Sequence, residues 1–233
     1  MQRRFVLEIS VESAEAAAAA ERGGAQRIEL CSDLSVGGLT PGNELFLAVR
    51  QQVAVPIFSM VRPRAGDFAY SGLEFAVMKE DIVRAKTLGA DGVVLGILQS
   101  DQRVDVARTR ELVQLAHPLP VTFHRAFDEC RDEYEGLEDV LAAGAKRILT
   151  SGSAPSAVDG VWTLGELVKY AGERIVIMPG AGINAGNLKS LVEETQAREF
   201  HSGLSSVIER PVSSYEKFEE EVRGMARIFS ELG

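Results

Sequence analysis

The chain has 233 residues, of which 45% are hydrophobic and 25% charged, and its 25 basic against 34 acidic side chains give a net charge of −9. This balance is that of a globular protein whose core needs no disulfide staples. Nucleic acids and anionic membrane surfaces both attract clustered positive charge, which the negative total argues against. We therefore expect neither a nucleic-acid partner nor a membrane partner.

The cellular compartment is predicted from the cysteines and the N-terminus. Cys31 and Cys130 are too few for a disulfide framework in a chain of this size, which is typical of a reducing compartment. Two arginines are followed by only three apolar residues before Glu8, so the sequence predicts no apolar region of a signal peptide. The longest alanine run, Ala16 to Ala20, is far shorter than the about 20 apolar residues of a membrane span. The sequence thus predicts a cytoplasmic protein.

Short β-branched segments alternate with longer segments of helical pattern. The predicted strands are Phe5–Ser10, Gln26–Cys31, Pro56–Val61, Gly92–Ile97, Pro120–His124, Arg147–Thr150, Ile175–Met178 and Glu199–His201. The predicted helices are Ser13–Arg22, Asn43–Gln52, Gly72–Leu88, Val106–Ala116, Gly136–Ala143, Val161–Ala171, Ala185–Thr195 and Ser214–Leu232. Several strands follow directly on a glycine helix stop, as at Gly23-Gly24-Ala25.

This repeat is the mark of βα units with short turns. Eight such units without a dividing linker predict a TIM (β/α)₈ barrel, α/β in class, as a single domain over residues 1–233. A doubly wound open sheet is the alternative, but that fold usually has fewer strands.

In such a barrel the active site lies at the C-terminal ends of the strands. Period-two alternation places Glu8 and Glu29 on the same faces of adjacent strands, side by side inside the barrel if those faces point inward. Buried carboxylates need cations or donors, and arginines follow the third strand. The residues predicted to act in catalysis are Glu8, Glu29, His124, Arg125 and Asp128. A purely structural polar layer is the alternative for the glutamate–arginine set.

Glycine loops after the sixth and seventh strands expose backbone N–H groups near the barrel mouth. Late loops and a helix N-terminus form the usual phosphate site of these barrels. The residues predicted to bind an anionic ligand are Arg62, Arg64, Thr150, Ser151, Gly152, Gly180, Gly182 and His201.

Soft donors also fall at the mouth. Cu(I) prefers thiolate and thioether ligands, with imidazole as a further donor. Cys31 is the predicted metal ligand. His124, His201 and Met178 are further candidates at the mouth, whereas Met60 is less well placed.

Six strings match a known family. They are Arg-Ile-Glu-Leu-Cys at 27–31, Gly-Gly-Leu-Thr-Pro at 37–41, Arg-Pro-Arg-Ala-Gly-Asp-Phe at 62–68, Pro-Val-Thr-Phe-His-Arg-Ala-Phe-Asp at 120–128, Leu-Thr-Ser-Gly at 149–152 and Pro-Gly-Ala-Gly-Ile at 179–183. Through them the chain resembles the CutC-type copper homeostasis proteins from Leu7 to His201. The resemblance implies a TIM barrel, a cytoplasmic homo-oligomer (a dimer or larger) and Cu(I) as ligand.

The chain departs from this pattern at Ser10, where family members commonly carry a second cysteine beside the one that corresponds to Cys31. A hydroxyl is a poor ligand for a soft metal, so half of a paired thiolate site is missing. Two hypotheses follow. The first is a copper homeostasis protein that binds Cu(I) through Cys31. The second is a lyase or isomerase of a small anionic or phosphorylated metabolite, with Glu29 or Glu8 as general base and His124 as general acid.

Overall fold

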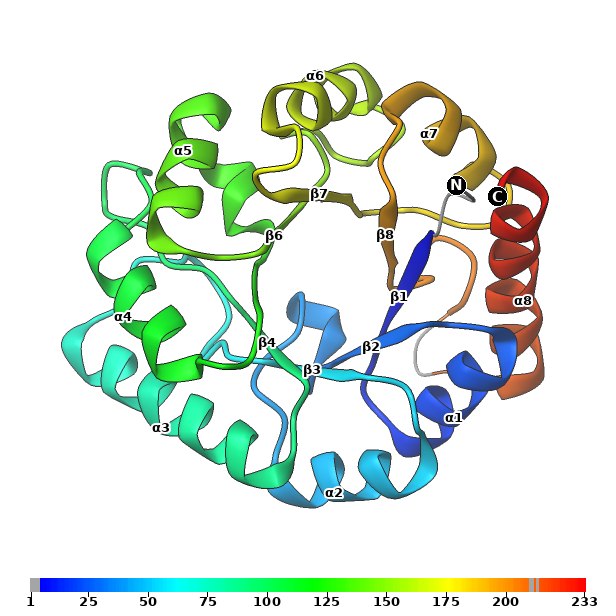
Figure 1. Ribbon diagram of the computed structural model, residues 1–233. Coiled ribbons are helices and arrows are strands. Elements are labelled where there is room, and N and C mark those ends of the chain that lie inside the picture. The colour runs from blue at the N-terminus through cyan, green and yellow to red at the C-terminus, as the bar shows by residue number, and fades with distance from the viewer. Residues whose placement is uncertain (1–4, 210–211, 213) are drawn as a thin grey trace.

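A computed structural model describes residues 5–209, 212 and 214–233 of the chain. Eight parallel strands form a ring, and helices surround it on the outside (Figure 1). The strands are β1 (Val6–Val11), β2 (Arg27–Leu30), β3 (Ile57–Met60), β4 (Gly92–Leu95), β5 (Val121–Phe123), β6 (Arg147–Thr150), β7 (Val176–Pro179) and β8 (Glu199–Ser202). Their hydrogen-bonded order is β7-β6-β5-β4-β3-β2-β1-β8, and β7 and β8 lie side by side across the remaining seam. The TIM-barrel prediction is confirmed.

Each strand leads into a helical segment on the outside. The α-helices are α1 (Ala14–Gly23), α2 (Asn43–Gln52), α3 (Gly72–Leu88), α4 (Val106–Ala116), α5 (Glu133–Ala143), α6 (Val161–Ala171), α7 (Leu188–Thr195) and α8 (Tyr215–Leu232). Two short 3₁₀ turns, η1 (Leu34–Val36) and η2 (Arg125–Glu129), follow β2 and β5 and were not predicted. Arg3 and Arg4, on which the prediction of a cytoplasmic location partly depends, lie outside the described residues.

Two helix starts differ from the prediction because of side-chain caps. Helix α5 begins three residues before Gly136, since the Asp132 carboxylate accepts the N–H groups of Tyr134 and Glu135. Helix α7 begins only at Leu188, because Asn184 accepts the Gly186 N–H in a turn of its own.

The two faces of the barrel strands carry different chemistry. Outward residues such as Leu7, Ile9 and Ile28 pack in the main apolar core beneath the helices. The alternating inward residues include buried charged side chains, Glu8 and Glu29 among them. The parallel register pairs Glu8 with His201 of β8, and Ser10 with Glu29 of β2. The site therefore stands inside a polar barrel lumen.

Candidate functional site

A cavity of about 500 Å³ lies at the C-terminal end of the barrel, lined by strand ends and by the loops that follow them. Half of the predicted site residues line it: Glu29, Arg62, His124, Arg125, Asp128, Gly182 and His201. The other half do not: Glu8, Cys31, Arg64, Thr150, Ser151, Gly152 and Gly180. Phe68, Met60 and the η1 turn also line the cavity, and sequence reasoning did not assign them to it.

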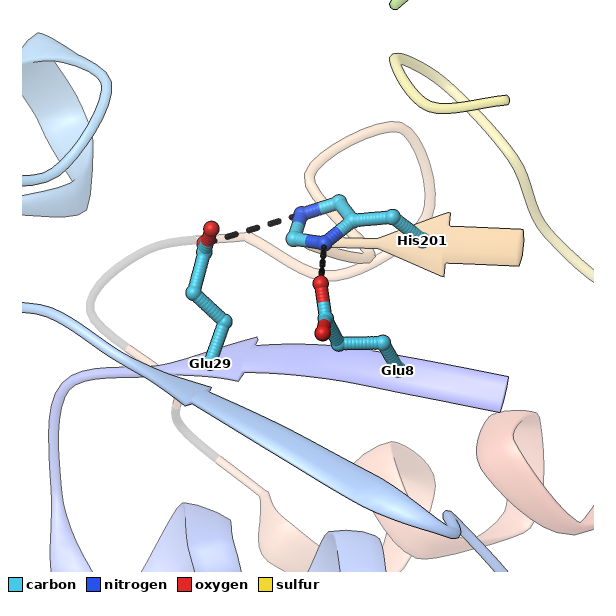
Figure 2. A group of neighbouring side chains, drawn as sticks. All are labelled: Glu8, Glu29 and His201. Carbon is cyan, nitrogen blue, oxygen red and sulfur yellow. Dashed lines mark hydrogen bonds and ion pairs between the residues drawn. The ribbon is translucent and has the colours of Figure 1, made fainter. Parts of the chain in front are cut away.

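His201 is held between two buried carboxylates, as Figure 2 shows. Its Nδ1 lies 2.8 Å from Glu8 Oε1 and its Nε2 lies 3.8 Å from Glu29 Oε2. Burial alone would lower the pKa of His201, but the charge of Glu29 and the hydrogen bond with Glu8 raise it above its usual value. The inward placement predicted for both glutamates is what brings them to one imidazole.

Glu8 and Glu29 differ in their surroundings. Burial raises the pKa of Glu8, but the Arg27 charge and the His201 hydrogen bond outweigh it and hold that carboxyl far below its ordinary range. For Glu29, burial raises the pKa and the charge of His201 offsets this only in part. Glu29 Oε1 is buried and has no hydrogen-bond partner among the described residues. Glu8 is thus a fixed anion, whereas Glu29 keeps an acceptor free at the cavity.

A ladder of ion pairs continues below the cavity. Arg27 pairs with Glu8 and with Glu199, 2.7 Å away, and Arg147 binds the same Glu199 at 2.6 Å. Both guanidinium groups lie over the Phe58 ring, 4.9 and 5.5 Å from its centroid. Arg27 and Glu199 stand two residues before Glu29 and His201, so period-two alternation could have indicated them.

The ligating atoms of Glu8, Glu29 and His201 lie within 4.8 Å of one another, a spacing that suits a metal ion. Each charge of the network, however, already faces an opposite one. The three carboxylates are Glu8, Glu29 and Glu199. They face the guanidinium groups of Arg27 and Arg147 and the imidazole of His201, whose pKa is raised toward its charged form. Because Glu8 is bound on both oxygens, the geometry is that of a balanced ion-pair network and needs no further cation.

His124 follows β5 and lines the cavity. Its Nδ1 accepts the Ala126 N–H at 3.1 Å, so a neutral ring carries its hydrogen on Nε2. The buried Nε2 has no partner among the described residues. Burial and the nearby charge of Arg62 lower the pKa of His124 to about 3. This imidazole is therefore neutral near pH 7.

The two arginines predicted to hold an anion are placed differently. Arg62 is buried at the cavity, and its terminal nitrogens donate to the carbonyls of Val36, Gly38 and Gly66. Its Nε has no direct hydrogen-bond partner in the described part of the chain, although the Tyr70 hydroxyl lies close enough to interact with this guanidinium. No carboxylate of the described residues forms an ion pair with Arg62. Arg64 does not line the cavity.

Arg64, which the sequence predicts to hold an anion, is engaged by other groups of the chain. It turns outward to Asp67, at 2.8 Å, and to Glu74. Its remaining donors bind backbone carbonyls, so the guanidinium is saturated outside the mouth.

The loop after β6 does not offer its N–H groups to an external anion. Asp128 accepts the N–H groups of Ser151, at 3.0 Å, and of Ser153, at 3.3 Å, together with the Thr150 and Ser151 hydroxyls. The Gly152 N–H goes to the Thr150 hydroxyl at 2.9 Å. A carboxylate of the chain itself therefore occupies the donors of Thr150 and Ser151, which the sequence predicts to bind a ligand, and the Gly152 N–H is bound within the loop.

In the loop after β7, Gly180 serves packing. Its N–H donates to the Thr150 carbonyl, and a Cβ there would lie 2.5 Å from Leu149 Cδ1. Gly182 lines the cavity and has a positive φ of 74°, a backbone conformation that glycine adopts without strain.

The soft donors are arranged differently from the prediction. Met178, predicted to lie at the mouth, does not line the cavity, and its Sδ lies 3.2 Å from Arg27 Nη2 in the ladder. Met60, which the sequence places less well, packs in one cluster with Cys31. Cys31 is fully buried, and burial together with the Glu29 charge raises the pKa of its thiol well above the usual value. The thiol donates to Glu29 Oε2 at 3.5 Å.

Comparison with known proteins shows the family of this chain. The model of the CutC family matches residues 5–206. The chain belongs to the CutC family. A human copper homeostasis protein cutC homolog is 48% identical over 87% of this chain and 74% of its own length. A family protein CutC of Chromobacterium violaceum is 48% identical over 84% of this chain and 80% of its own length.

A CutC structure from Streptococcus agalactiae matches with a TM-score of 0.81 and 33% identity, covering 85% of this chain and 98% of its own. The resemblance found in the sequence is thus confirmed, and the names of the human protein and of the Streptococcus agalactiae structure state copper homeostasis. Among the described residues, none of the helices is long and apolar enough to cross a membrane.

Proposed function

We propose that the barrel mouth of this CutC protein binds a small anionic metabolite and transfers a proton to or from it. One observation carries the proposal: three buried polar atoms without a partner in the described residues belong to side chains that line one cavity. They are Glu29 Oε1, Arg62 Nε and His124 Nε2. Buried polar atoms are nearly always paired in a folded protein, so such a group fits a site that a ligand completes.

The charge of the site supports an anionic ligand. Arg62 has no carboxylate partner among the described residues, whereas Arg125 at the rim pairs with Asp128 at 2.8 Å and His201 pairs with Glu8 at 2.8 Å. A volume of about 500 Å³ suits a metabolite-sized molecule. Glu29, with a free oxygen and a raised pKa, supplies the proton acceptor.

The test is a calorimetric binding screen of small phosphate and carboxylate metabolites. Arg62→Gln is compared with Arg64→Gln, a matched control that removes the same group outside the cavity. A hydrogen bond to a charged group is worth about 1.5–3 kcal/mol, so affinity falls at least about tenfold in Arg62→Gln and is kept in Arg64→Gln. Absence of any binder, or equal losses in both variants, contradicts the proposal.

A second candidate function, Cu(I) binding, is favoured by the neighbourhood of Cys31 and Met60. Both flank Gly38, where a Cβ would lie 2.8 Å from the sulfur of Cys31 and 3.5 Å from Met60 Cε. Thiolate and thioether are the donors that Cu(I) prefers. The raised thiol pKa opposes binding at neutral pH, because the metal must displace the proton.

An anaerobic titration against a chromophoric Cu(I) chelator tests this candidate. Copper handling at Cys31 requires stoichiometric binding that is lost in Cys31→Ala and weakened in Met60→Leu, with Cys130→Ser as the matched control. Binding that is unchanged in Cys31→Ala refutes it.

We extend the proposal to the setting of the protein: a cytoplasmic homo-oligomer whose residues 1–233 form one domain. The two free cysteines support a reducing compartment. Cell fractionation, sedimentation and a single cooperative unfolding transition test these three statements.

A further inference from the structure

We propose that the ligand is a hydroxyaldehyde or hydroxyketone carrying an anionic group, and that His124 donates a hydrogen bond from Nε2 to its carbonyl oxygen. The inference rests on the proposed function, because it names the class of molecule that the same cavity takes. It follows from the donors and acceptors that the protein leaves open.

The position and tautomer of His124 are fixed by its neighbours. The Ala126 N–H donates to Nδ1 at 3.1 Å, which leaves Nε2 as the hydrogen-bearing nitrogen. The ring packs 4.9 Å from the Phe68 centroid, and Gly96 makes room for it, since a Cβ there would lie 2.5 Å from Nδ1. A neutral donor held in this way approaches a carbonyl oxygen without bringing a charge that the substrate would have to balance.

Side chains that line the cavity carry two buried donors and one buried acceptor that have no hydrogen-bond partner in the described residues. The donors are His124 Nε2 and Arg62 Nε, and the acceptor is Glu29 Oε1. A complementary ligand presents a carbonyl oxygen to the imidazole, an anionic group to the guanidinium and an acidic hydrogen to the carboxylate. A C–H bond beside a carbonyl is such a hydrogen. Hydroxyl groups on the ligand match the serine side chains in the wall, at Ser10 and Ser205.

The corresponding reaction needs no cofactor. Glu29 removes the proton from the carbon beside the carbonyl, the C–H electron pair forms a C=C bond, and the carbonyl π pair moves to the oxygen that His124 Nε2 contacts. If the proton returns to the former carbonyl carbon and the hydroxyl proton passes to the former carbonyl oxygen, the product is an isomer of the substrate. One carbon is reduced and its neighbour is oxidised, so no outside oxidant or reductant is consumed.

Deuterium exchange provides the test. The full chain is incubated in D₂O with dihydroxyacetone phosphate, ribose 5-phosphate, fructose 6-phosphate and their unphosphorylated parents, and proton NMR follows uptake beside the carbonyl. We expect uptake with a phosphorylated probe, lowered at least about 100-fold in Glu29→Gln and in His124→Asn, as for loss of a general base or an oxyanion donor. Glu138→Gln, on the exterior of α5, is the matched control and keeps the wild-type rate.

A measurement on the wild-type chain keeps the inference refutable if His124→Asn folds poorly. The ¹⁵N shifts of the imidazole distinguish an Nε2–H ring from an Nδ1–H ring and from a protonated one. An Nε2–H ring at pH 7 is expected, and either of the other two forms overturns the inference. Anion binding that depends on Arg62 without deuterium uptake refutes the substrate class alone, whereas absence of binding removes the proposed function as well.

Discussion

His124 makes the fold sensitive to acid, and the effect can be worked out from its burial. The ordinary pKa of histidine is about 6.5, and that of His124 in the folded chain is about 3. Between these values the unfolded chain binds a proton that the folded chain does not, so stability falls as the pH drops. At about 1.4 kcal/mol per pH unit below 6.5, the loss from pH 7.5 to pH 5 is about 2 kcal/mol.

Urea unfolding of wild type and His124→Asn at the two pH values measures this loss. The variant is less stable at pH 7.5 because it leaves a void, but we expect its deficit to shrink by about 2 kcal/mol at pH 5. Glu29, whose pKa is raised in the folded chain, makes the fold more stable as the pH drops over part of this range. This contribution cancels in the comparison, because wild type and variant both carry Glu29. Thr109→Val removes a buried polar group that does not titrate and serves as control. A deficit that stays constant between the two pH values refutes the reasoning.

Three further predictions concern the interior and are measured by denaturant unfolding near pH 7. Arg27→Met leaves Glu8 as a buried charge without its main partner and costs about 3–5 kcal/mol, and a loss below 1 kcal/mol contradicts the ladder. Gly92→Ala places a Cβ 2.5 Å from the Phe58 ring and costs about 1–3 kcal/mol through overpacking, which an unchanged midpoint would disprove. Thr109→Val removes a buried hydroxyl without a partner and is neutral or stabilises by up to about 1 kcal/mol, whereas a clear loss would reveal a partner.

The architecture was predictable because its signals are local. A glycine stop followed by a β-branched run recurs along the chain, and both features depend on a few neighbouring residues. Period-two alternation likewise placed Glu8 and Glu29 inward. The helix starts at Glu133 and Leu188 were missed, because each depends on which of several polar side chains caps the backbone.

The contacts within the site were harder to predict, since they join distant parts of the chain. Arg62 and Arg64 are two residues apart and look equivalent in the sequence, yet β3 ends at Met60 and the alternation does not continue beyond it. Arg62 therefore turns inward and Arg64 outward. Asp128 was expected to act on a ligand, but the η2 turn carries it onto the loop after β6. Pairing of β1 with β8, which brings His201 to Glu8, depends on barrel closure.

The organisation of the lumen favours ligand chemistry over thiol-based copper binding as its main use. In the ladder each carboxylate pairs with a guanidinium group. These ion pairs therefore have a structural role in the lower barrel. At the mouth the polar groups are not all paired. Arg62 has no carboxylate partner in the described residues, and Nε2 of the neutral His124 has no acceptor there. Cys31, by contrast, is enclosed, protonated and bonded to Glu29. A ligand at the mouth satisfies groups that are already placed and desolvated, whereas Cu(I) at Cys31 must first expel a proton beside a buried carboxylate.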